Sequence, residues 1–214
     1  MCPIWYSYAK SFYKMEKNIK IAMKYSKKIF SKSRCKDLPF HNLQHTLDVY
    51  KNLIKIGAYE NIPYKDLEPI MVAGLFHDTG NAFRFQGHED VSATYAVLFM
   101  EKNGYDEDYI EKVCRYIRAT KIPQKPRNIY ESIICDADLF HLGTNSYHTN
   151  NKLLRREWQN FLGLEYSEAE WLILNIKFLQ DHKFHSQYGR LKLEPQKQKN
   201  LDELKKQYVS VCRS

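Results

Sequence analysis

Residues 67–78, LEPIMVAGLFHD, are apolar on nearly every side of the helix that their pattern predicts. A helix of this kind is stable only when other elements cover it, so we expect it to lie at the centre of the fold. Its last two residues, His77 and Asp78, are then at least partly withdrawn from water. A buried imidazole beside a carboxylate needs a partner, and a cation satisfies both groups.

The rest of the chain is also predicted to be helical. Only 8 glycines and 7 prolines occur in 214 residues, and the alternating pattern of β-strands is nearly absent. Further helices are expected over residues 8–32, 42–56, 90–103, from 106 onward, and through the last third of the chain. We therefore predict an all-α protein, with residues 1–214 forming a single domain.

Several helix ends are predicted from residue type. Gly57 is expected to stop the second helix, and Asp66 is expected to cap the central one. Further N-terminal caps are expected at Asp106, at Asn128 with Glu131, and at Ser167 with Glu170.

Charge and cysteine usage narrow the class of protein. The formal net charge of +8 favours anionic partners: nucleotides, phosphorylated metabolites, RNA or an acidic membrane surface. Five scattered cysteines without a CxxC pair indicate reduced thiols, not disulfides or a thiolate zinc site. We find no secretory signal and no membrane-spanning apolar run, and we expect a cytoplasmic protein.

Lysines line one face of the first predicted helix, between Lys10 and Lys28. We interpret this lysine face as solvated surface, and a stripe that contacts phosphate or membrane is the alternative.

Histidines and carboxylates recur at the ends and polar faces of predicted helices. FHNLQHTLDV, residues 40–49, places His41 and His45 four apart, and CDADL offers a carboxylate after the His77–Asp78 pair. Two imidazoles and two carboxylates suit Mn²⁺, Fe²⁺, Co²⁺, Ni²⁺, Mg²⁺ or Zn²⁺, with coordination left for water and a phosphate oxygen.

This order of elements, H…HD…D, resembles the HD superfamily of metal-dependent phosphohydrolases over about residues 40–142. The resemblance implies an HD-type helical bundle with flanking N- and C-terminal helices packed on it. It also implies four ligands to a divalent metal ion: His45, His77, Asp78 and Asp138. Asp138 is preferred because the family's AD dipeptide matches Ala137–Asp138, and Asp136 remains the alternative.

FHNLQHTLDV is also similar to the YHNxxHxxDV of class I cyclic-nucleotide phosphodiesterases and related HD proteins. This similarity implies that His41 protonates the leaving oxygen, so that His41 and Asp78 are the candidate catalytic residues. The range in which an imidazole titrates suits a general acid. Asp48 could orient a neighbouring imidazole as a supporting carboxylate.

Other residues are candidates for a second metal ion or for the phosphate. Some HD proteins hold a second ion with a later histidine, which would be His88 here, with Asp78 bridging. Positive groups around the phosphate could be supplied by Arg84, Lys121 and Arg155.

The chain departs from the related patterns in three places. Asn81 stands where the HDxxHPG run of the cyclic-nucleotide enzymes has a second histidine. Thr120 and Lys121 stand where binuclear members place a further histidine, so the number of ions stays open. The GYP extension of the cyclic-di-GMP-specific branch is absent.

We therefore predict a metal-dependent phosphohydrolase, a phosphodiesterase or phosphomonoesterase, acting on a nucleotide or another small phosphoester through metal-activated water. Two alternatives are a nucleotide-binding HD-type sensor without turnover and a basic helical nucleic-acid-binding protein. The substrate, the native metal and the oligomeric state stay open.

Overall fold

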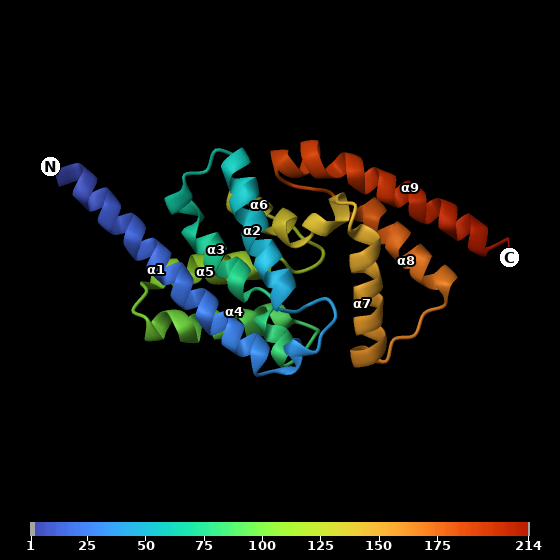
Figure 1. Cartoon of the computed structure of the whole chain (residues 1–214), viewed down its shortest axis with the longest axis horizontal. Helices are drawn as coiled ribbons and strands as arrows, with labels where there is room; N and C mark the ends of the chain where they lie inside the picture. Colours follow the sequence, from blue (N-terminus) through green and yellow to red (C-terminus); the bar gives the residue numbers. More distant parts are fainter. Residues whose placement is uncertain (1–2, 214) are drawn as a thin grey trace.

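The computed structural model describes the backbone of residues 3–213 and the side chains of residues 15–213, and every regular element within them is helical (Figure 1). The predicted all-α class is confirmed. The α-helices are α1 Pro3–Ser31, α2 Leu43–Tyr59, α3 Glu68–Phe76, α4 His88–Lys102, α5 Glu107–Ala119, α6 Ile129–Asp138, α7 Tyr147–Leu162, α8 Glu168–Asp181 and α9 Glu194–Val211.

α3 is the buried centre of the fold, as its apolar sequence predicts. All residues from Ile70 to Phe76 are buried, and α1, α2, α5 and α6 pack around them. A helix of 9 residues does not persist alone in water. Burial stabilises α3 by about 1.5–3 kcal/mol for each large apolar side chain. Because α3 is buried, His77 and Asp78 at its end are carried into the interior.

The end of α2 differs from the sequence-based expectation. The helix passes through Gly57, ends at Tyr59, and is followed by Asn61 in the left-handed region with φ 55°. A Cβ on Gly57 would lie 2.6 Å from the side chain of Leu67. Gly57 therefore permits close packing of α2 and does not terminate it.

The start of α3 also differs, because Asp66 is not its cap. A 3₁₀ turn, Tyr64–Leu67, leads directly into the helix, and Leu67 occupies the N-cap position without a side-chain bond. Pro69 stands in the first turn, where a missing N–H leaves no partner unsatisfied.

The other predicted caps are confirmed. Asp106 accepts the N–H of Tyr109, Asn128 accepts the N–H of Glu131, and Ser167 with Glu170 forms a complete capping box. In a complete capping box the carboxylate of Glu131 would accept the N–H of Asn128, but here it accepts the N–H of Arg127, one residue earlier.

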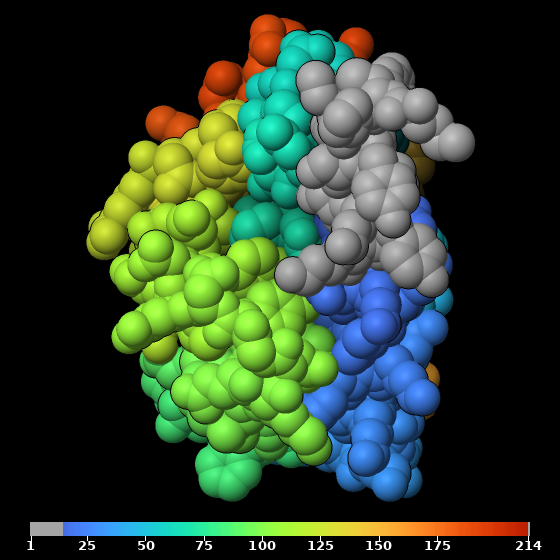
Figure 2. Space-filling view, turned by 90° about the vertical axis from the view of Figure 1, so that its left-hand side faces the viewer, coloured from blue at the N-terminus to red at the C-terminus, as the bar shows by residue number. Residues whose placement is uncertain are grey.

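α1 lies along the outside of the core. The ring of Tyr25 packs 5.2 Å from that of Phe99 in α4, and Figure 2 shows α1 in blue beside the green surface of α4 and α5. From Lys17 to Lys28 the lysines are exposed, as expected of a solvated face, and Lys10 and Lys14 lie outside the described side chains. No described helix has the length and apolar character that crossing a bilayer requires.

The cysteines agree with the expectation of reduced thiols. Cys35, Cys114, Cys135 and Cys212 are free. Cys2 lies outside the described residues.

Asp136 fastens the C-terminal helices to the end of α6. Its buried carboxylate accepts the N–H groups of His185 and Ser186, each at 2.8 Å, and the hydroxyl of Ser186 at 2.5 Å. α8 and α9 pack against each other, and α9 also contacts the turn Phe140–Gly143 that follows α6 (Figure 1). These contacts fix the position of the residues that end α6.

Gly80 lets the turn Thr79–Ala82 approach the start of α4 at very short range. A Cβ on Gly80 would lie 2.0 Å from the carbonyl oxygen of His88, and the N–H of Gly80 donates to Ser92 Oγ at 2.8 Å. The contact sets where α4 begins relative to the end of α3.

We expect Gly80→Ala to lower the free energy of unfolding by about 1–3 kcal/mol or more, since the added methyl meets backbone that cannot rotate away. Urea denaturation followed by circular dichroism measures the loss. Gly57→Ala is the matched control, because the nearest atoms to its Cβ belong to the end of the Leu67 side chain. Equal losses in the two variants would contradict this account.

Candidate metal centre

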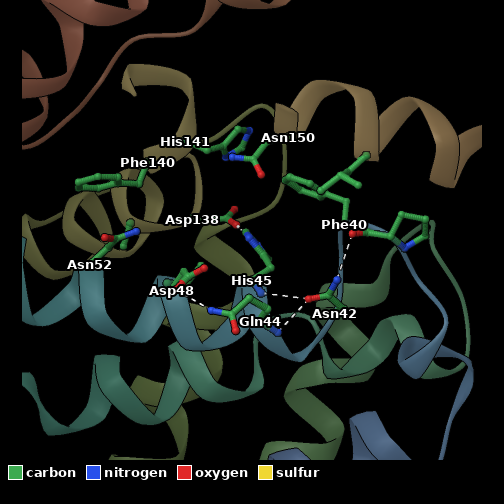
Figure 3. Close-up of a pocket in the computed structure, with 14 residues that line it drawn as sticks. Phe40, Asn42, Gln44, His45, Asp48, Asn52, Asp138, Phe140, His141 and Asn150 are labelled. Atoms are coloured by element: carbon green, nitrogen blue, oxygen red, sulfur yellow. Dashed lines mark hydrogen bonds and ion pairs between the residues drawn. The ribbon is translucent and has the colours of Figure 1, made fainter. Parts of the chain in front are cut away.

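The first turn of α2 positions His45. Asn42 caps the helix, and its side-chain oxygen accepts the N–H of Gln44 at 2.8 Å and that of His45 at 3.2 Å. This cap fixes the direction in which the first turn of α2 presents its side chains. In Figure 3 the imidazole of His45 points toward Asp138, with His141 and Asn150 on the far side of that carboxylate.

The end of α3 orients His77. Its Nδ1 lies 2.8 Å from the carbonyl oxygen of Gly74, which can only accept a hydrogen bond. Nδ1 therefore carries the proton of the neutral ring, and the lone pair lies on Nε2. This nitrogen faces His45, Asp78 and Asp138.

Four side chains meet at one point between α2, α3 and α6. Nε2 of His45 lies 3.4 Å from Nε2 of His77 and 3.2 Å from Oδ1 of Asp138. Asp78 Oδ2 lies 3.4 Å from Nε2 of His45 and 3.2 Å from Nε2 of His77. One ligand atom from each of His45, His77 and Asp138 can be chosen so that all three lie within 4.8 Å of one another.

The donor set fits a divalent cation. Asp78 Oδ2 is buried and accepts no hydrogen bond from any described residue, which is unfavourable for a carboxylate oxygen. Nε2 of His45 and Nε2 of His77 face each other at 3.4 Å. The hydrogen bond from Nδ1 of His77 to Gly74 leaves the lone pair of that ring on Nε2. A positive ion between these atoms satisfies the orphaned oxygen and both nitrogens.

Asp138, and not Asp136, is the carboxylate in this cluster. Asp138 is the last residue of α6, and its side chain is 16% exposed. Asp136 is fully buried, and its oxygens are occupied by His185 and Ser186. The two acids are two residues apart on a helix, so they point to different sides.

The cluster favours ion pairs when no cation balances it. Burial opposes the positive charge on His77, but the carboxylates of Asp78 and Asp138 outweigh it and raise the pKa of His77 well above its usual value. Burial likewise opposes the charge on Asp78, but His77 and His41 hold the pKa of this carboxyl well below its usual value. Metal binding must displace protons from such imidazoles, so the affinity should weaken in acid.

His41 is held by a carboxylate from α7. Glu157 is fully buried, and its Oε2 accepts the N–H groups of Phe40 and His41 at 2.8 and 2.9 Å. Its Oε1 lies 2.5 Å from Nδ1 of His41. Burial opposes a charge on His41, but Asp78 and Glu157 outweigh it and raise the pKa of His41. The Nδ1–H group of His41 therefore donates its hydrogen bond to Glu157, and Nε2 lies on the other side of the ring.

His88 contacts the second oxygen of Asp78. Its Nε2 lies 3.1 Å from Asp78 Oδ1, and its Nδ1 lies 2.8 Å from the carbonyl oxygen of Phe85. Asn81 donates to the same Oδ1 at 3.2 Å. Burial opposes the charge on His88, but the hydrogen bond and the charge of Asp78 raise its pKa to about 9. Asp78 thus separates His88 from the imidazoles of His45 and His77.

Two of the three cationic residues suggested for phosphate contact, Arg84 and Arg155, have partners elsewhere. Arg84 is exposed and donates to the carbonyl oxygen of Gly87. Arg155 pairs with Glu168 and also donates to a backbone carbonyl oxygen. Lys121 lines a separate cavity. A phosphate role for Arg84 and Lys121 stays a prediction.

Asp48 does not orient an imidazole. Its carboxylate accepts from Gln44 at 3.0 Å and pairs with Lys51 at 3.1 Å on the outer surface of α2. It lines a cavity of about 130 Å³ that also includes His45, Asp138 and His141.

Sequence reasoning missed Glu157 and Gln124. Glu157 lies in LLRREWQNF, which resembles any solvated helix, and 116 positions separate it from His41. Gln124 lies in a proline-broken connection, and its Nε2 is 3.5 Å from Asp138 Oδ2. Neither residue has a motif that would reveal its role, because both act through tertiary contacts.

Comparison with known proteins agrees with this geometry. The family model described as HD domain matches residues 42–143. No curated protein matches the chain, and no solved structure does. Proteins of the HD domain family are generally metal-dependent hydrolases. The matched segment includes α2 to α6 and the whole His45, His77, Asp78 and Asp138 cluster. Residues 42–143 therefore match an HD domain, and this match supports an HD superfamily protein.

Proposed function

We propose that this protein is a metal-dependent phosphohydrolase that cleaves a nucleotide or another small phosphoester. The observation that carries the proposal is the convergence of two imidazoles and two carboxylates, with Asp78 Oδ2 buried and accepting no hydrogen bond from the described residues. His45, His77, Asp78 and Asp138 would hold the ion. When bound, a divalent ion lowers the pKa of water and withdraws negative charge from phosphoryl oxygens.

The chain's own residues supply the proton and the shape of the site. His41 lies beside the cluster, with ring centroids 5.9 Å from His45 and 6.3 Å from His88. With Nδ1 bonded to Glu157, a protonated His41 has Nε2–H available for the leaving oxygen. Glu157 thus acts as a positioning residue that fixes the ring and favours its charged form.

His141 keeps the outer side of the cluster uncharged. Burial is the main cause that lowers the pKa of His141 to about 3, and the nearby His45 adds to it. Its ring packs 5.2 Å from that of Phe40. A neutral imidazole here adds no positive charge that would compete with a cation between the ligands.

We expect His45→Ala and Asp138→Asn to lose the bound ion while remaining folded, because each removes one ligand from the cluster. Inductively coupled plasma mass spectrometry of the purified proteins measures the metal content. Asp48→Asn is the matched control and should keep the ion, since the recorded partners of this carboxylate are Gln44 and Lys51 and not the candidate ligands.

The same measurement separates the two acids of α6 and counts the ions. Asp136→Asn should lower stability but leave the metal content of the folded protein unchanged. A second ion at Asp78 Oδ1 would give two per chain and fall to one in His88→Ala. Full metal content in Asp138→Asn would overturn the ligand assignment.

We expect Mn²⁺-loaded protein to hydrolyse at least one member of a panel of p-nitrophenyl phosphate, bis-p-nitrophenyl phosphate and nucleotides. A spectrophotometric or chromatographic assay follows the products. Chelation should abolish turnover, and His77→Ala should reduce it at least about 100-fold, because water activation is lost. A metal-loaded sample that binds a nucleotide but hydrolyses nothing would favour a sensor.

We expect Glu157→Gln to move the alkaline limb of the kcat profile to lower pH by about one unit. The sign follows from the raised pKa of His41: the acid is active while protonated, and activity falls as pH rises through that pKa. Removing the negative partner lowers the pKa, so activity is lost earlier. Steady-state kinetics from pH 5 to 10 should show little change in KM, and an unmoved limb would argue against His41 as the acid.

A further inference from the structure

A strongly cationic cavity lies between α5, the connection that follows it and the start of α6. Its volume of about 550 Å³ is in the range of small-molecule sites. Five cationic side chains line it: Arg115, Arg118, Lys121, Lys125 and Arg127. The acids among its lining residues are Glu111 and Glu131, so positive charge outweighs negative charge around the cavity. Such a cavity favours an anionic ligand.

The sequence gathers these cations into one short segment. RYIRATKIPQKPR, residues 115–127, contains five cationic residues and no acid. Arg115 and Arg118 are three apart in α5 and therefore lie on the same face of that helix. The prolines of the connection prevent the helix from continuing, and the lysines of the connection line the same cavity as the two arginines. Grouped like charges repel one another, which is unfavourable until an anion balances them.

Acids from neighbouring helices hold the two arginines of α5. Nε of Arg118 donates to Oδ1 of Asp90 in α4 at 3.0 Å. Nε of Arg115 lies 3.5 Å from Oε1 of Glu131 in α6. Glu131 is buried, and its other oxygen accepts the N–H of Arg127 at 2.7 Å. Because Asp90 engages Nε of Arg118, the terminal N–H groups of that guanidinium remain available to a ligand. A side chain that is already held loses less entropy when it binds an anion.

The three cations that follow α5 have no acid partner. The side chains of Lys121, Lys125 and Arg127 are exposed and form no ion pair or hydrogen bond with a described residue. Arginine presents a planar fork of N–H donors that matches phosphate oxygens, and lysine presents a compact ammonium on a flexible stem. The lining therefore combines arginines that are held in place with lysines that can adapt to a ligand.

We propose that this cavity binds a small polyphosphate anion, with the chemistry of inorganic triphosphate or of the triphosphate group of a nucleotide. Several cations around one cavity match a ligand that carries several negative charges. A single phosphate would leave most of these donors unused. The proposal does not depend on the hydrolase function, because it concerns a different part of the molecule.

The cavity is distinct from the candidate metal centre. None of the four candidate metal ligands lines it. Gln124, in the same connection as the lysines, does not line it either, and its Nε2 lies 3.5 Å from Oδ2 of Asp138. No imidazole, thiol or hydroxyl group lines the cavity, and the buried acid Glu131 is already engaged by Arg115 and Arg127. The cavity therefore binds its ligand and does not cleave it.

Isothermal titration calorimetry on the metal-free full chain tests the site without any hydrolysis. Inorganic triphosphate and ATP are the probes, and at least one should bind. Inorganic phosphate should bind at least about tenfold more weakly, and the affinity for the bound probe should fall as the salt concentration rises. Equal affinity for the two probes assigns recognition to the phosphates alone. Tighter binding of ATP assigns part of it to the nucleoside.

A double variant and a matched control locate the binding. Lys121→Gln combined with Lys125→Gln should weaken binding of the probe at least about tenfold, because two charged donors are lost. Neither lysine has a partner in the fold, so this variant should remain as stable as the unaltered protein. Lys152→Gln combined with Lys199→Gln removes the same charge from exposed lysines outside the cavity and should keep the affinity. Circular dichroism establishes that both variants are folded.

The remaining outcomes would overturn the proposal. If neither probe binds, or if both double variants lose affinity equally, the cavity is not an anion site. His45→Ala should bind the probe as the unaltered protein does, and a loss there would place the anion at the metal centre. Single-stranded RNA that binds more tightly than triphosphate, with the same dependence on Lys121 and Lys125, would make the surface a nucleic-acid interface. Because no arm measures turnover, the hydrolase proposal stands or falls separately.

Discussion

The burial of α3 is the constraint from which the rest of the molecule follows. A short helix with apolar residues on all sides must be covered, so α1, α2, α5 and α6 pack around it. Its end then delivers His77 and Asp78 into an interior where unpaired polar groups are unfavourable. α2 and α6 bring His45 and Asp138 to the same place. One packing requirement thus produces both the core and the donor set.

Charge balance explains why the cluster tolerates so many titratable groups. The buried carboxylate of Asp78 and the partly buried carboxylate of Asp138 would repel each other, yet His45, His77 and His88 surround them at 3.1 to 3.4 Å. Protons hold this arrangement together when no cation is present, and a divalent ion can replace them. The same balance reaches His41, because the charges of Asp78 and Glu157 raise its pKa. The acid role proposed for His41 and the proposed metal site would therefore share one electrostatic environment.

Much of this arrangement is predictable from the sequence, because it depends on local rules. The buried helix follows from periodicity, and the caps at Asp106 and Ser167 follow from cap chemistry. The order of the candidate ligands comes from the resemblance to the HD superfamily. Gly57 and Asp66 were predicted wrongly since tertiary packing, not local preference, decides the end of α2 and the start of α3. The choice between Asp136 and Asp138 needs the direction of each side chain. Glu157 and Gln124 act across the fold and carry no local signal.

The position of Glu157 in the chain separates ion binding from the proposed supply of a proton. The candidate ligands all lie within the matched residues 42–143, whereas the carboxylate that anchors His41 comes from α7, beyond that range. Under the acid role proposed for His41, substitutions in α7 would change the supply of the proton without altering any of the four candidate ligands. The four candidate ligands alone would then report on ion binding and not on the rate of catalysis.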